Sequence, residues 1–128
     1  MTITTQVKRT VYCTFNFEGW HTWPNAPEQF KYLSYPHRHL FYVRAEMSVT
    51  EADREVEFIF MKSELLDATK FRFASTQATP FSASCETIAE AVATVMKDRY
   101  GQQRHIKVDV SEDNENGGTY EYIPQIEL

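Results

Sequence analysis

Cysteine is scarce in this sequence, and the two cysteines present form no local motif. Cys13 and Cys85 are the only thiols among 128 residues, and no CxxC pair occurs. Disulfide-dense scaffolds carry many more cysteines at close spacings. We therefore interpret both residues as free thiols in a reducing compartment, and we expect a cytoplasmic protein.

Long apolar runs and a basic face are also missing. No apolar run approaches the ~18 residues that a membrane span requires, and residues 1–10 contain no apolar stretch resembling a secretory signal. The net charge is −5, with acidic and basic residues mixed along the chain. A nucleic-acid backbone normally needs a concentrated basic face. We expect neither a membrane nor a nucleic acid as partner.

What is present predicts a globular α+β protein. The apolar share of 42% and the aromatic share of 14% suit a packed core, and the length suits a single domain over residues 1–128. Alternation with period two predicts strands at 6–18, 37–50, 105–110 and 119–123. Apolar residues at helical spacing predict helices at 57–67 and 86–100. The order ββααββ predicts a four-stranded antiparallel sheet with both helices on one face.

The same patterns predict which side chains are buried. On the first strand the predicted inward residues are Val7, Val11, Cys13, Phe15 and Phe17. On the second strand they are Phe41, Val43, Ala45, Met47 and Val49, and on the third they are Ile106, Val108 and Val110. The first helix has a stripe of Phe58, Met61, Leu65 and Leu66, and the second has Ile88, Ala89, Val92, Val95 and Met96. We expect a loop with one helical turn at 22–36, a loop at 69–83 and a tight turn at 114–118. Ser82 and Ser84 are candidate N-caps of the second helix, and Gly101 is expected to end it.

Three histidines have the spacing of a metal site. His37 and His39 are two residues apart on a predicted strand, so their side chains leave the same face. His21 shares the parity of Phe15 and Phe17 if its strand continues through residue 19. Three imidazoles with one open position are the pattern of catalytic zinc. The alternative is that His37 and His39 are ordinary strand residues bonded to backbone carbonyls.

Three further residues have both a functional and an ordinary interpretation. Glu112 continues the inward face of the third strand and could accept two parallel N–H bonds from a guanine or pterin edge. It could equally lie in an acidic turn after the strand has ended. Glu86 suits the first turn of its helix as a partner of the helix dipole, and a pocket role is the minority interpretation. Cys85 could be a nucleophile at a helix N-terminus, but a small buried residue is the better interpretation because no neighbouring histidine activates it.

Five segments together resemble a known family, the 6-pyruvoyl-tetrahydropterin synthase and 6-carboxy-tetrahydropterin synthase enzymes of the T-fold group. Residues 17–21, FEGWH, resemble the strand end that gives the family's first zinc ligand, and residues 37–43, HRHLFYV, resemble the segment that gives the other two. Residues 56–62 are similar to the start of the family's first helix. Residues 84–89, SCETIA, and 108–112, VDVSE, are similar to two segments beside the pterin. In the second of these, Glu112 matches the glutamate that anchors the ring.

The resemblance implies a T-fold, zinc held by His21, His37 and His39, and a planar ligand anchored by Glu112 near Ser84, Cys85 and Glu86. It also implies a homo-oligomer, a trimeric barrel or a pair of such barrels, with ligand sites at subunit interfaces. The sequence departs from the family at the proton relay. Residues 22–36 contain no cysteine, and Asp67-Ala68 stands where the family has an Asp-His pair.

Three functions follow from these features. The first is a zinc-dependent, lyase- or synthase-like enzyme acting on a pterin, deazapurine or guanine-nucleotide derivative, with Asp67 and Cys85 as weak candidates for catalysis. The second is a non-catalytic protein that captures a purine nucleotide or signal molecule. The third is a structural oligomer in which zinc only holds strand ends together.

Overall fold

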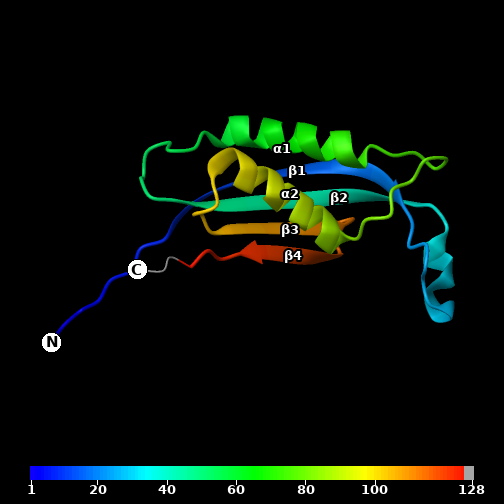
Figure 1. The fold of residues 1–128 in the computed structure, drawn as a ribbon, viewed down its shortest axis with the longest axis horizontal. Helices are drawn as coiled ribbons and strands as arrows, with labels where there is room; N and C mark the ends of the chain where they lie inside the picture. The colour runs from blue at the N-terminus through cyan, green and yellow to red at the C-terminus, as the bar shows by residue number, and fades with distance from the viewer. Residues whose placement is uncertain (126–128) are drawn as a thin grey trace.

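The chain folds into a four-stranded antiparallel sheet with two α-helices on one face, seen in a computed structural model that describes residues 1–125 (Figure 1). The strands, in their spatial order, are β1 (Arg9–His21), β2 (His37–Val49), β3 (Ile106–Glu112) and β4 (Asn116–Tyr122). The helices are α1 (Phe58–Phe73), which packs on β1, and α2 (Cys85–Tyr100), which packs on β3 and β4. A short 3-10 helix, η1 (Glu28–Ser34), lies in the β1–β2 connection. The predicted α+β order is confirmed.

The core lies between the sheet and the helices, where the predicted alternation places it. Along most of β1, β2 and β3, every second residue is buried, because side chains alternate between the two faces of a sheet. These buried residues are Cys13, Phe15 and Phe17 on β1, Phe41, Val43, Ala45 and Met47 on β2, and Ile106, Val108 and Val110 on β3. Val7 was predicted to join them, but it precedes β1 and is 62% exposed. The first strand therefore begins and ends three residues later than predicted. Its buried face continues through Gly19 to His21.

Helix α1 is longer than the sequence pattern predicted. It runs to Phe73, six residues beyond the predicted end, with Glu57 as its N-cap. Its buried stripe repeats every four residues and consists of Met61, Leu65, Thr69 and Phe73. The Thr69 hydroxyl donates to the Leu65 carbonyl, so a residue that favours loops is satisfied inside the helix. Phe58, predicted to be inward, is instead 53% exposed in the first turn.

Helix α2 follows the prediction closely. Ser84 is the N-cap and accepts a hydrogen bond from the Thr87 backbone N–H, whereas Ser82 plays no capping part. Gly101 ends the helix with φ of 95°, a left-handed conformation that glycine adopts without strain. Among residues 1–125, no helix is both long and apolar enough to cross a bilayer.

The hairpin between β3 and β4 is tighter than predicted. β3 includes Glu112, so the interpretation in which the strand stops before this residue is wrong. The turn covers residues 113–115, and Asp113 and Asn114 adopt φ values of 55° and 59°. Aspartate and asparagine tolerate this left-handed region better than other side chains do. β4 therefore starts at Asn116, and Glu112 pairs with Asn116 in register.

Candidate metal centre and adjoining cavity

Three imidazoles and one carboxylate converge at one end of the sheet. His21 and His37 are directly opposite each other in the β1–β2 register, and His39 lies opposite Gly19. β3 then brings Glu112 opposite Phe41, one inward position beyond His39. One ligand atom from each of these four residues, His21, His37, His39 and Glu112, lies within 4.8 Å of the other three. The sequence-based grouping of the three histidines is thus borne out in space.

Each imidazole is oriented by an acceptor bonded to its Nδ1 atom. His21 Nδ1 lies 3.0 Å from the Ala83 carbonyl and His37 Nδ1 lies 2.8 Å from the Tyr35 carbonyl. His39 Nδ1 lies 2.7 Å from Asp113 Oδ2. Carbonyls and carboxylates only accept, so Nδ1 donates in each case, and in the neutral ring Nε2 keeps its lone pair for a metal ion. This is how proteins orient histidines that bind metals.

Glu112 completes the cluster from the β3 side. Its Oε2 atom is 2.7 Å from His39 Nε2 and 3.3 Å from His21 Nε2. An acceptor oxygen and a ring lone pair repel at such distances unless a proton or a cation lies between them. The contacts around Glu112 therefore suit a cation held between its carboxylate and the imidazole nitrogens.

The donor set fits a bound metal ion. His21 is 8% exposed, and its Nε2 atom is buried without a hydrogen-bond partner among the described residues. Burial lowers the pKa of His21 below its ordinary value, which favours the neutral, metal-binding form. A buried polar atom without a partner is costly, and a cation facing His21 Nε2 removes that cost. Imidazole nitrogens with one carboxylate oxygen suit zinc and related divalent metals.

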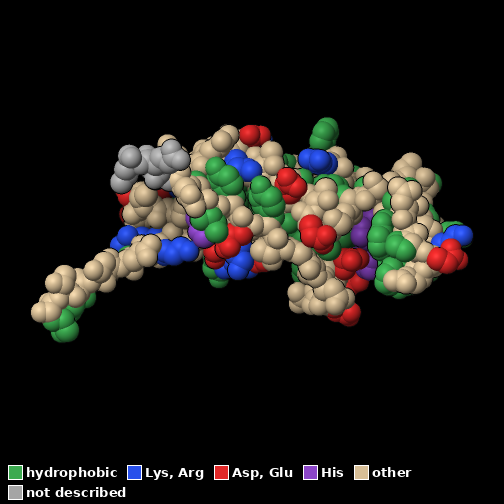
Figure 2. Space-filling view, turned by 60° about the horizontal axis from the view of Figure 1, so that its bottom comes forward, with side chains coloured by type: hydrophobic (Ala, Val, Ile, Leu, Met, Phe, Trp, Pro, Cys, Tyr) green, Lys and Arg blue, Asp and Glu red, His purple; other side chains and the backbone are tan. Residues whose placement is uncertain are grey.

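A cavity of about 440 Å³ opens beside the cluster. His21, His37 and Glu112 line one side of it. The other sides come from residues 82–86 before and at the start of α2, from Asn116 and Gly117 of β4, and from Trp23 and Leu33 of the β1–β2 connection. Toward the right-hand end, Figure 2 shows histidine side chains at the surface beside acidic and hydrophobic groups. This is the end that carries η1 in Figure 1.

The predicted ligand-binding residues lie together in this cavity, whereas one predicted catalytic candidate does not. Ser84, Cys85 and Glu86 all line it with Glu112. Asp67 is exposed on α1 and is absent from the lining. Burial, with the nearby charges of Glu112 and Glu86, raises the pKa of the Cys85 thiol to about 12. A thiol held in its protonated form is a poor nucleophile.

Two glycines let aromatic and acidic side chains approach the site. A Cβ atom on Gly19 would lie 2.9 Å from the Phe81 ring and 3.1 Å from the Phe41 ring. Both rings pack around His21, with centroid distances of 5.4 Å and 5.1 Å. A Cβ atom on Gly118 would lie 2.7 Å from Cγ of Glu86. Glycine at 118 therefore makes room for Glu86 at the cavity.

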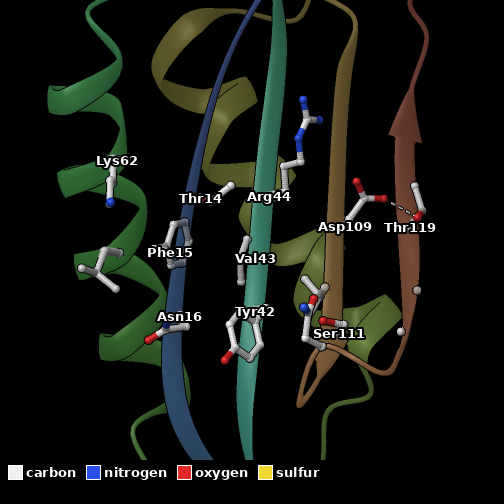
Figure 3. Close-up of a pocket in the computed structure, with 15 residues that line it drawn as sticks. Thr14, Phe15, Asn16, Tyr42, Val43, Arg44, Lys62, Asp109, Ser111 and Thr119 are labelled. Atoms are coloured by element: carbon white, nitrogen blue, oxygen red, sulfur yellow. Dashed lines mark hydrogen bonds between the residues drawn. The ribbon is translucent and has the colours of Figure 1, made fainter.

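A larger hollow of about 900 Å³ lies on the face of the sheet that the helices leave open (Figure 3). Three of its polar side chains have partners, one pair within the hollow and one residue with groups outside it. Thr119 donates to Asp109, and Arg44 pairs with Glu46 while lying over the Tyr12 ring at 4.3 Å. An uncovered antiparallel sheet commonly presents such a polar face to water. The metal cluster is at the other cavity, so that cavity is the candidate site.

Asp113 is the site residue that the sequence did not reveal. Its Oδ2 accepts from His39, and its Oδ1 accepts from the Leu40 backbone N–H at 3.0 Å. The hydrogen bond from His39, followed by that from Leu40, lowers the pKa of Asp113 below its ordinary value. The one available signal is an aspartate directly after the strand that ends in Glu112.

No protein-family model matches this chain, and a search of curated proteins finds no relative.

Proposed function

We propose that the chain is a divergent zinc protein of the 6-pyruvoyl-tetrahydropterin synthase kind, with a T-fold, that acts on a pterin, deazapurine or guanine-nucleotide derivative. His21, His37 and His39 hold the metal in this proposal. The cavity beside them takes the planar ring, with Glu112 as its anchor and Glu86 as part of the wall.

One observation carries the proposal: three oriented imidazoles and one carboxylate bring their ligand atoms within 4.8 Å of one another at the wall of a cavity. Each histidine has its Nδ1 atom engaged, and Nε2 of His21 is buried without a partner among the described residues. The cavity volume of about 440 Å³ lies within the range of small-molecule sites. A bound zinc ion would supply Lewis-acid polarisation of a ligand oxygen.

The protein's own contribution is binding and orientation. A carboxylate such as Glu112 accepts two parallel N–H bonds from the edge of a guanine or pterin ring. Trp23 stacks on Phe30 with a centroid distance of 6.0 Å and presents an aromatic surface at the cavity wall. A planar ring fits between such a surface and the acidic groups.

A second candidate function is capture of the ring without chemistry. General acid–base catalysis needs a side chain that titrates near the working pH. Outside the four-residue cluster, the ionisable side chains lining the cavity are Cys85 and Glu86. The raised pKa of Cys85 removes it from this role. The sequence also lacks the family's relay residues, and this favours a sequestering protein over the family reactions.

The proposal includes a homo-oligomer, a trimer or a pair of trimers. β1 and β4 are the two edges of the sheet. Residues 75–81 cover only the His21 end of the β1 edge, through bonds from Trp20 N to Ser75 and from Thr22 N to Phe81. Uncovered edges pair readily with strands of another chain, and a second copy is the partner proposed here.

Native mass spectrometry of protein purified without added metal tests the proposal. We expect zinc, a mass that is a multiple of 15.0 kDa, and a co-purified heterocycle. His37→Ala should remove the zinc. The matched control is His105→Ala, because His105 pairs with Glu121 on β4, away from the cluster.

Ring binding is measured separately, by quenching of tryptophan fluorescence with pterin, guanine and guanosine monophosphate. Glu112→Gln should abolish ring binding and leave the three imidazoles able to hold zinc. Unchanged affinity for all three probes in that variant would contradict both ring-binding functions. Zinc that is needed for thermal stability, with no ring bound by the wild type, would identify the third function, a structural metal.

A further inference from the structure

Two carboxylates follow each other at the end of β3, and they are held in different ways. Asp113 is fixed from two sides, by His39 Nδ1 at 2.7 Å and by the Leu40 backbone N–H at 3.0 Å. Glu112 contacts only ring nitrogens, His39 Nε2 at 2.7 Å and His21 Nε2 at 3.3 Å. Within residues 1–125, no backbone N–H or neutral side chain donates to the Glu112 carboxylate, although the Glu115 backbone N–H donates to the Glu112 backbone carbonyl. One carboxylate is therefore anchored and its neighbour is free to move.

Glu112 occupies the position that an incoming ligand would need. Three imidazoles leave one position open on a tetrahedral ion, and the Glu112 oxygen lies among the same ligand atoms, all within 4.8 Å. Its side chain also lines the cavity and is 31% exposed. The same carboxylate therefore faces both the metal position and the cavity.

We infer that Glu112 is an exchangeable fourth metal ligand, which closes the metal centre while the cavity is empty and leaves it when a ring with paired N–H donors enters. This role of Glu112 rests on the proposed function, since it presupposes both a metal ion and a ring in the cavity. In this inference Glu112 shields the metal while the cavity is empty, and the metal becomes accessible only when the ring is bound. When both carboxylate oxygens accept N–H bonds from the ring edge, the carboxylate turns away from the metal ion. Ring binding and metal binding by Glu112 therefore compete.

The free side chain gives this exchange a low structural cost. The backbone of Glu112 is fixed by β-pairing to Phe41 on one side and to Asn116 on the other. Only side-chain rotation is needed, because Asp113 and not Glu112 holds His39 in place. His39 therefore keeps its orientation when Glu112 turns away.

Cobalt(II) in place of zinc, with azide as the probe, tests the exchange without any reaction. The absorption spectrum of the cobalt protein reports the number of ligands and the arrival of azide. We expect wild type to bind azide weakly, and Glu112→Gln to bind it at least about tenfold more tightly, because the fourth position is then open. Glu86→Gln is the matched control, since Glu86 lines the same cavity but lies outside the metal cluster.

A second arm uses pterin. Adding pterin to the wild-type cobalt protein should change its spectrum and raise its azide affinity toward that of Glu112→Gln. Glu112→Asp, with a side chain one methylene shorter, should also bind azide more tightly than wild type while keeping the wild-type circular dichroism. This second variant keeps the test valid if the glutamine variant fails to fold.

The outcomes separate the exchange from the proposed function. Equal azide affinity in wild type and Glu112→Gln overturns the exchange and leaves the metal site standing. Failure of pterin, guanine and guanosine monophosphate all to bind, with the azide difference present, overturns the proposed ring while Glu112 remains a metal ligand. Failure of the wild type to bind cobalt at all overturns both.

Discussion

At the scale of single residues, the site depends on atoms that hold the histidines as much as on the histidines themselves. His39 is oriented by Asp113, whose other oxygen is tied to the Leu40 backbone. A carboxylate behind a metal-binding imidazole fixes its tautomer and raises its basicity. Asp113 therefore belongs to the site although it faces neither the cavity nor the cluster centre.

Replacing Asp113 with asparagine should weaken metal binding by about 10–100-fold. Asparagine tolerates the φ of 55° at this position, so the turn and the fold should persist. Competition with a chromophoric chelator measures the affinity. Asp109→Asn is the control, because Asp109 bonds Thr119 on the open face of the sheet. Equal metal affinity in the two variants would contradict a role for Asp113.

Both cysteines should be unreactive in the folded protein. Burial raises the pKa of Cys13 to about 11 and that of Cys85 to about 12, so neither forms a thiolate near neutral pH. A thiol reagent at pH 8 should label neither residue until denaturant is added, when both should react. Rapid labelling of Cys85 in the native state would restore it as a candidate nucleophile.

Residue parity predicted much of the site, and its limits have a physical cause. His21, His37, His39 and Glu112 share a face because side chains on strands alternate, and this follows from the sequence. Asp113 acts by reaching back from a left-handed turn to another strand, which no periodicity encodes. The Ala83 and Tyr35 carbonyls are backbone groups, and their role depends on where a loop passes.

At the scale of elements, the β3–β4 hairpin carries Glu112 and also sets the wall of the cavity. Its two consecutive glycines have different neighbours. An added Cβ at Gly117 would meet the Val110 carbonyl oxygen of the adjacent strand, a backbone contact that no side-chain rotation relieves. An added Cβ at Gly118 would meet the Glu86 side chain, with 2.7 Å to Cγ and 3.0 Å to Oε1, and that side chain can turn away.

Gly117→Ala should therefore destabilise the protein by about 1–3 kcal/mol, whereas Gly118→Ala should change stability by less than about 0.5 kcal/mol. Urea unfolding gives both values. Gly118→Ala should nevertheless alter ring binding, because it displaces Glu86 in the cavity. Equal stability of the two variants would contradict this difference, because it would show that the β4 backbone shifts to accommodate a Cβ atom as readily as the Glu86 side chain does.

Element boundaries were predicted less well than element order. Helix α1 continues through Thr69 to Phe73 because Thr69 can bond the Leu65 carbonyl and face the core. Sequence propensity alone favours a loop at such a residue. Burial of Thr69 decides the outcome in α1. At Glu112 it is pairing with β4 that extends the strand past its last apolar residue.

At the scale of the whole molecule, a second polar cluster secures the end opposite the metal site. Glu55 accepts from the backbone and hydroxyl of Thr50 and from Arg104, which also donates to the Ser48 carbonyl. These bonds join the end of β2 to the connections that precede α1 and β3. The hydrogen bond from Thr50, then that from Arg104, lowers the pKa of Glu55 from 4.5 to about 2.

Glu55 should stabilise the fold at neutral pH and cease to do so in acid. The folded protein holds the lowered pKa and the unfolded chain regains the ordinary one, so the contribution is complete above pH 4.5 and disappears as pH falls toward 2. The difference in melting temperature between wild type and Glu55→Gln should shrink over this range. A difference that stays constant down to pH 2 would contradict the assignment.

The register of β1 against β2 places His21 opposite His37 and Gly19 opposite His39. Sliding one strand by two residues would keep every apolar side chain on its own face, so hydrophobic burial distinguishes such slipped pairings only weakly. The imidazoles, however, would no longer meet. An ion held by all three imidazoles would thus stabilise the correct strand register over the slipped ones during folding. Molecules with a slipped register would form a fraction that does not bind metal.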